Sequence, residues 1–63
     1  MSDYGNLHLV HAYKGYGECL YVKGYVEDAI ENFETAANLI KEDLNFKMTL
    51  WDTIATLYYM IGN

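Results

Sequence analysis

The sequence contains no proline and no arginine, and Cys19 is its single cysteine. One cysteine excludes an intrachain disulfide, and without proline no helix is interrupted by a residue that lacks an amide hydrogen. Nine acidic residues against four lysines leave a net charge of −5. Binding to nucleic acid or to an anionic membrane surface requires clustered cations, so the composition argues against both.

Long apolar runs are also missing. No stretch of about 18 apolar residues is present, so no segment is predicted to span a membrane. The first residues lack the basic region and the apolar run that are typical of a secretory signal. A cytoplasmic location is therefore the default expectation.

Apolar residues are nevertheless abundant for so short a chain. They make up 52% of the 63 residues, and seven residues are tyrosine. A domain of this size buries only about 60% of the surface of its unfolded chain. The chain therefore has more apolar surface than three short helices can bury. The composition therefore predicts a protein partner, a homo-oligomer such as a dimer, or membership of a longer repeat array.

Three segments place apolar residues at spacings of three and four, which is typical of one face of a helix. We predict an all-α fold of three antiparallel helices at about 4–22, 26–43 and 46–61, in one domain over residues 1–63.

Local signals mark the ends of these helices. Ser2 and Asp3 are candidate N-caps, Gly24 is expected in the left-handed conformation, and Asn45 is expected to mark the second break. Gly17 lies on the apolar face of the first helix, which indicates close approach of a neighbouring backbone there.

The first and third helical segments are related by a constant offset. The stretch from Tyr13 is repeated in shortened form from Trp51, and the equivalent residues are 38 positions apart: Tyr13 and Trp51, Tyr16 and Ile54, Gly17 and Ala55, Leu20 and Tyr58, Gly24 and Gly62. A fixed offset between similar segments indicates a repeat architecture. The chain would then hold one complete helical hairpin and the first helix of a second.

This pattern resembles the tetratricopeptide repeat, a 34-residue helical hairpin. The residues that carry the resemblance are Tyr13, Tyr16, Gly17, Leu20, Gly24, Ala29, Phe33 and Ala36, followed by Trp51, Ile54, Ala55, Tyr58 and Gly62 in the half copy. Tyr16 and Leu20 exchange the family's usual order of aliphatic and aromatic residue, and Lys41 stands where a proline is expected. The 38-residue period implies a second helix about one turn longer than usual.

The resemblance implies a non-catalytic protein–protein interaction module, or adaptor, that binds a peptide or helix of a partner in a concave groove. The matching groove positions are His11, Lys14, Glu18, Tyr21 and Val22 in the first helix and Thr49, Asp52, Thr56, Tyr59 and Met60 in the third. Tyr21 and Tyr59 are one repeat apart and could contact one ligand. The alternative interpretation is that these tyrosines only cover the core.

A second hypothesis is a self-assembling structural or small regulatory subunit. It would oligomerise through the open flank of the third helix, and the candidate residues for this self-association are Phe46, Leu50, Leu57 and Ile61.

We expect no enzymatic activity, no metal and no cofactor. His8 and His11 are three residues apart and could share a metal, but no cysteine or carboxylate nearby completes a ligand set. Cys19 has no basic neighbour in the sequence to activate it, and we expect it to be a small, packed helix residue. Glu18 and Thr56 occupy the positions at which some repeats of this kind carry the asparagines of a carboxylate clamp, so such a clamp is not expected.

Overall fold

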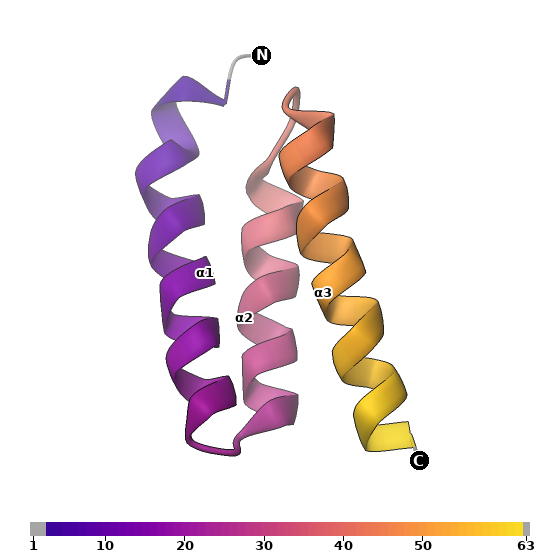
Figure 1. Cartoon of the computed structure of the whole chain (residues 1–63). Helices are drawn as coiled ribbons and strands as arrows, with labels where there is room; N and C mark the ends of the chain where they lie inside the picture. The colour runs from indigo at the N-terminus through magenta and orange to yellow at the C-terminus, as the bar shows by residue number, and fades with distance from the viewer. Residues whose placement is uncertain (1–2, 63) are drawn as a thin grey trace.

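The computed structural model describes residues 3–62, and these residues form helices joined by short connections (Figure 1). A short 3-10 helix, η1 (Tyr4–Asn6), leads into α1 (Leu7–Val22), which is followed by α2 (Val26–Leu39) and α3 (Leu44–Gly62). Successive helices run antiparallel, and the described part of the chain contains no strand. The predicted all-α fold is confirmed. None of these helices is long and apolar enough to cross a membrane.

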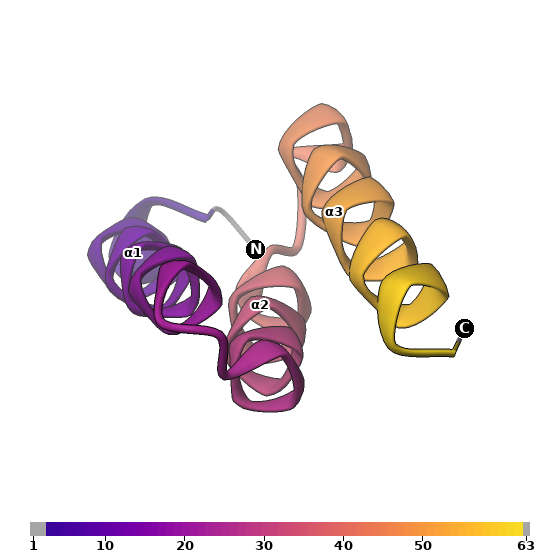
Figure 2. The same ribbon diagram turned by 60° about the horizontal axis from the view of Figure 1, so that its bottom comes forward.

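The three helices form a single layer with α2 in the middle. The Cα atoms extend over 38 × 18 × 12 Å. Figure 2 shows that the layer is bent at α2, with α1 on one side of it and α3 on the other. Because α2 packs against both neighbours, its side chains supply most of the core.

The core follows the apolar stripe that the sequence predicts for the second helix. Ala29, Ile30, Phe33, Ala36, Ala37 and Ile40 are all buried, and they are joined by Val10 of α1 and by Leu50, Ile54 and Leu57 of α3. Leu44, four residues after Ile40, is not part of the core; it is 62% exposed because it opens α3. The described residues include no buried polar or charged residue, so burial of apolar surface stabilises this core.

Gly17 allows α1 to approach α2 closely. A Cβ atom added at Gly17 would lie 3.1 Å from the ring of Phe33 and 3.2 Å from the carbonyl oxygen of Ala29. The predicted close approach at this glycine is confirmed. At Gly15, which also lies within α1, an added Cβ would meet nothing within 4 Å.

Gly24 ends α1 in the left-handed conformation, with a φ of 91°. The amide of Tyr25 donates to the carbonyl oxygen of Leu20 at 2.9 Å, and the amide of Gly24 donates to the carbonyl oxygen of Tyr21 at 3.0 Å. This is the Schellman arrangement of a helix C-terminus, in which the left-handed residue is usually glycine. The turn predicted from Gly24 is confirmed.

The second connection differs from the prediction. α2 ends at Leu39 rather than near residue 43, and Ile40 is extended, with a φ of −83° and a ψ of 126°. Asn45 lies inside α3 and is not left-handed, because α3 begins at Leu44. The carboxylate of Asp43 accepts a hydrogen bond from the amide of Phe46 at 3.1 Å and so caps α3. α2 has 14 residues and α1 has 16, so the second helix is not lengthened as the 38-residue offset implied, and only residues 40–43 connect it to α3.

Asp3 ties the start of the chain to this connection. Its carboxylate accepts hydrogen bonds from the amides of Lys41, Glu42 and Asp43, and it lies 2.9 Å from the amide of Glu42 and 2.7 Å from the amide of Asp43. These amides precede the positive end of α3, where an acidic side chain is favourable. Asp3 is thus not the side-chain cap of the first helix that the sequence predicts, and Ser2 lies outside the described residues.

Replacing Gly17 by alanine should destabilise the protein, whereas the same change at Gly15 should stabilise it. Alanine in place of a glycine within a helix gains up to about 1 kcal/mol, and at Gly15 nothing opposes that gain. At Gly17 the new methyl group would press on the backbone of α2, and we expect a net loss of about 1 kcal/mol. Chemical denaturation of both variants measures the two changes, and equal stabilisation by both would contradict the close approach.

Replacing Asp3 by asparagine should lower the temperature of unfolding at neutral pH. The backbone amides of Lys41 and Asp43 hold the pKa of Asp3 below its ordinary value of 3.8. Because the pKa of Asp3 is lower in the folded protein than in the unfolded chain, the carboxylate stabilises the fold at pH values above its pKa in the unfolded chain. This stabilisation is lost as the pH falls through the pKa of Asp3 in the folded protein. The difference between wild type and Asp3→Asn should therefore shrink below about pH 3.8 in thermal unfolding.

Asp52→Asn is the matched control, because it removes one negative charge from an exposed position in the middle of α3. A similar loss of stability in this variant would show that net charge, and not the contact between Asp3 and the connection, is responsible.

Candidate functional site

A hollow lies between α1 and α3, with α2 as its floor. It has a volume of about 230 Å³, and the residues that line it are Tyr21, Phe33, Thr53, Thr56, Leu57 and Met60. Phe33 and Leu57 are buried, whereas Tyr21, Thr56 and Met60 are exposed at its rim. Three of the ten groove residues in the resemblance-based prediction, Tyr21, Thr56 and Met60, are thus brought together.

Thr49, Thr53 and Thr56 form one wall of α3, and each of their hydroxyl groups already donates a hydrogen bond to the backbone. The hydroxyls of Thr49, Thr53 and Thr56 each donate to a carbonyl oxygen four residues earlier, at 3.0, 3.2 and 3.0 Å. Such bonds to the preceding turn occupy the donor of a helical threonine. This wall is therefore suited to apolar contact more than to donating hydrogen bonds to a ligand.

Towards the start of α3, His11 of α1 contacts Phe46. Their ring centroids are 5.5 Å apart, and the planes are tilted by 32°. His11 is exposed and Phe46 is partly buried. Because α1 and α3 run in the same direction (Figure 1), this contact lies towards the start of both helices and the Tyr21 hollow towards their ends.

Lys14 and Glu18 form an ion pair on α1. The Lys14 ammonium donates to the Glu18 carboxylate at 3.0 Å across one helical turn. The side chain of Lys14 is 34% exposed and that of Glu18 is 58% exposed, so the pair contributes only about 0.3–0.5 kcal/mol to the stability of the helix. Neither residue lines the hollow that contains Tyr21.

The remaining predicted groove residues lie elsewhere. Val22 is 83% exposed and lines a separate hollow on the outside of α1. Asp52 and Tyr59 are two and nine residues after the buried Leu50, which at about 100° per residue places them on the opposite side of α3. Tyr59 is 73% exposed, and it is Met60 and not Tyr59 that shares a hollow with Tyr21.

The prediction of an exposed self-association patch is wrong for two of its four residues. Leu50 and Leu57 are 1% and 4% exposed, because they form the face of α3 that covers α2. Phe46 is partly buried, and Ile61 is 42% exposed. The exposed apolar residues on the flank of α3 are Trp51, Tyr58 and Ile61, with exposed fractions of 38%, 48% and 42%.

Cys19 also differs from the prediction, because it is exposed and free. It lies nine residues after the buried Val10, half a turn around α1 from the core. Among residues 3–62, no three histidine, cysteine, aspartate or glutamate side chains are grouped so that they could hold a metal ion.

The groove residues that the sequence prediction missed are Phe33, Thr53 and Leu57. A signal for the α3 wall is present in the spacing: Phe46, Thr49, Thr53, Thr56 and Met60 recur at intervals of three and four and form one stripe beside the buried face.

Comparison of the chain with protein-family models, with curated proteins and with solved structures gives no match.

Replacing Leu50 by alanine should destabilise the protein far more than replacing Ile61 by alanine. Removal of a fully buried leucine side chain costs about 2–5 kcal/mol, because it leaves a cavity. Ile61 is already 42% exposed, so its truncation should cost about 1 kcal/mol or less. Urea unfolding of both variants at low temperature measures the difference. Equal costs would contradict the assignment of Leu50 to the core and of Ile61 to the surface.

Proposed function

We propose that the chain is a non-catalytic protein-interaction module of the tetratricopeptide-repeat type, which binds a helix or extended peptide of a partner in the groove between α1 and α3. The observation that carries this proposal is the hollow that Tyr21 and Met60 form above Phe33 and Leu57. Two equivalent helices of a repeat contribute its rim, and the helix between them contributes its floor.

The size and chemistry of the hollow support a side chain of a partner as the ligand. Its volume of about 230 Å³ is below the range of about 300–1,000 Å³ that is typical of small-molecule pockets. Its lining includes no carboxylate, lysine, histidine or cysteine, so it offers neither a catalytic pair nor a charge for a polar ligand. An apolar anchor residue of a partner fits these properties, with Tyr21 as a rigid aromatic contact beside it.

Selection of peptides from a displayed random library on the purified protein tests the proposal. We expect peptides with a large apolar anchor, and we expect Tyr21→Ser and Met60→Ser to weaken a selected peptide at least about tenfold, which is about 1.4 kcal/mol. Fluorescence anisotropy of the labelled peptide measures the affinity.

Tyr16→Ser is the matched control. Tyr16 is an exposed tyrosine on α1, five residues from Tyr21 and so about 140° around the helix from it. Affinity that falls equally in Tyr16→Ser, or that is unchanged in both groove variants, would contradict binding in this groove. Circular dichroism confirms that each variant keeps its helices.

A further inference from the structure

A second surface lies on the other side of α3 from the groove. One hollow, of about 360 Å³, is lined by Glu27, Ile30, Glu31, Glu34, Tyr58 and Ile61. An adjoining hollow, of about 540 Å³, is lined by Gly24, Tyr25, Val26, Glu27, Asp28 and Ile61. Because both contain Glu27 and Ile61, they form one continuous surface, which we call the acidic flank. It shares no lining residue with the groove.

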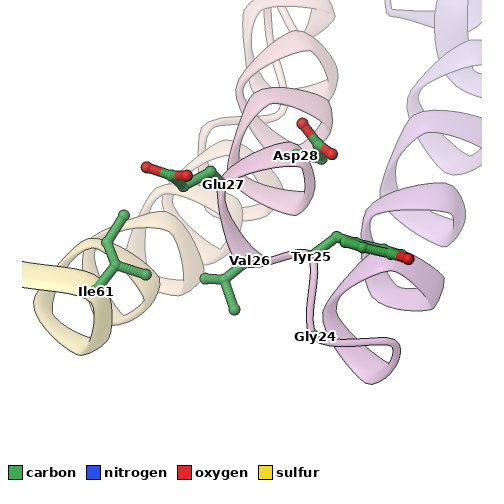
Figure 3. A pocket seen from close by; sticks show the side chains of 6 residues that line it. All are labelled: Gly24, Tyr25, Val26, Glu27, Asp28 and Ile61. Carbon is green, nitrogen blue, oxygen red and sulfur yellow. The ribbon is translucent and has the colours of Figure 1, made fainter.

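The centre of the acidic flank is apolar. Figure 3 shows Val26 at the start of α2 and Ile61 at the end of α3 with their side chains turned toward the same opening. Ile30 is buried beneath, while Tyr58 and Ile61 are 48% and 42% exposed. Trp51, seven residues before Tyr58 on the same face of α3, extends this apolar row and is 38% exposed. Exposed apolar side chains gathered on one face in this way mark an interaction surface.

Glutamates border this apolar centre at helical spacing. Glu27, Glu31 and Glu34 follow each other at intervals of four and three residues and so form one edge of α2. In Figure 3 the side chain of Glu27 is on the side of α2 that faces α3, whereas Tyr25 and Asp28 are on the side of α1. No lysine lines either hollow.

Tyr58 joins the apolar centre to this acidic edge. Its hydroxyl donates to the carboxylate of Glu34 at 3.0 Å, and this bond links α3 to α2 across the flank. This hydrogen bond to Glu34 raises the pKa of the Tyr58 phenol above its ordinary value. The aromatic ring is thereby held in place as part of a preformed surface.

The charges disfavour a second copy of the chain as the occupant. Two copies meeting through this face would bring together two sets of three glutamates, and each chain carries a net charge of −5. Lys47, the one lysine of α3, donates to the carbonyl oxygen of Ile40 at 3.2 Å and lies near the other end of the helix. Like charges placed opposite each other across an interface oppose association.

We propose that the acidic flank binds a basic amphipathic helix of another protein. The apolar face of that helix lies against Val26, Tyr58 and Ile61, and its Lys or Arg residues pair with Glu27, Glu31 and Glu34. A helix laid alongside α2 presents cations at intervals of three and four residues, which matches the spacing of the three glutamates. This surface is separate from the groove, so the proposal for the acidic flank and the proposal for the groove can be tested and rejected independently.

The probe is a displayed library of helical peptides with a fixed leucine stripe, in which the positions beside the stripe are randomised among Lys, Glu and Ser. Selection on the whole protein should enrich Lys at intervals of three and four residues. The triple variant Glu27→Gln, Glu31→Gln and Glu34→Gln should weaken an enriched peptide at least about tenfold, and raising the salt concentration should weaken its binding to the wild type. Ile61→Ser should weaken it independently of salt, because it removes apolar contact.

The matched control is the triple variant Glu18→Gln, Glu42→Gln and Asp52→Asn, which changes the net charge by the same amount at positions that line neither hollow of the flank. This control should bind the peptide within about twofold of the wild type, as should Tyr21→Ala. If both triple variants weaken binding of the peptide equally, the loss of affinity is caused by the change in net charge and not by the position of the glutamates, and the proposal is wrong. Enrichment of Glu or Ser beside the stripe, or no enrichment, would also overturn it.

A second copy as the occupant would appear in sedimentation. If the wild type forms a dimer that Ile61→Ser dissociates, the flank is a self-association surface and the proposal is wrong. We expect the wild type to sediment as a monomer at the concentrations used for peptide binding, and we expect all variants to keep their helical circular dichroism.

Discussion

Phe33 occupies the place where the three helices meet. On one side its ring packs into the space that the missing side chain of Gly17 leaves on α1. On the other side it borders the hollow formed with Tyr21 of α1 and Leu57 of α3. The close approach of α1, the filling of the core and the floor of the groove thus depend on one aromatic side chain. A single layer of helices has no second layer to take over this role.

The position of α3 depends on a different kind of interaction. A short connection must leave α2 at Leu39, keep Ile40 in the core and start a new helix at Leu44. The amides exposed by this break donate hydrogen bonds to the carboxylate of Asp3, which lies near the start of the chain. The carboxylate of Asp43 caps the new helix. Charge-assisted hydrogen bonds of this type are stronger than neutral ones, and here they join the first residues to the connection that orients α3.

The two surfaces of α3 differ in their chemistry because the helix turns by about 100° per residue. The stripe that includes Thr53, Thr56 and Met60 faces α1 and lines an uncharged hollow. The stripe that includes Tyr58 and Ile61 borders three glutamates of α2. Interactions in the groove should therefore depend mainly on apolar fit, whereas those on the flank should also depend on ionic strength.

The sequence by itself determined the number and order of the helices, the stripe of α2 and the roles of two glycines. These features are local: the apolar period of α2 appears within one segment, and Gly24 ends α1 through bonds to residues of the preceding turn. Gly17 was identifiable because a glycine on an apolar stripe costs stability unless a neighbour needs the space.

Only the tertiary structure decided which face of α3 is covered. Leu50 and Trp51 are adjacent apolar residues, and nothing in their spacing shows that the first is buried against α2 while the second is exposed. The direction of α3 depends on the connection from Ile40 to Asp43, and that connection is held by Asp3, about forty residues away in the chain. A pattern within one helix carries no information about such a contact, so the wall of the groove and the acidic flank became visible only when the helices were packed together.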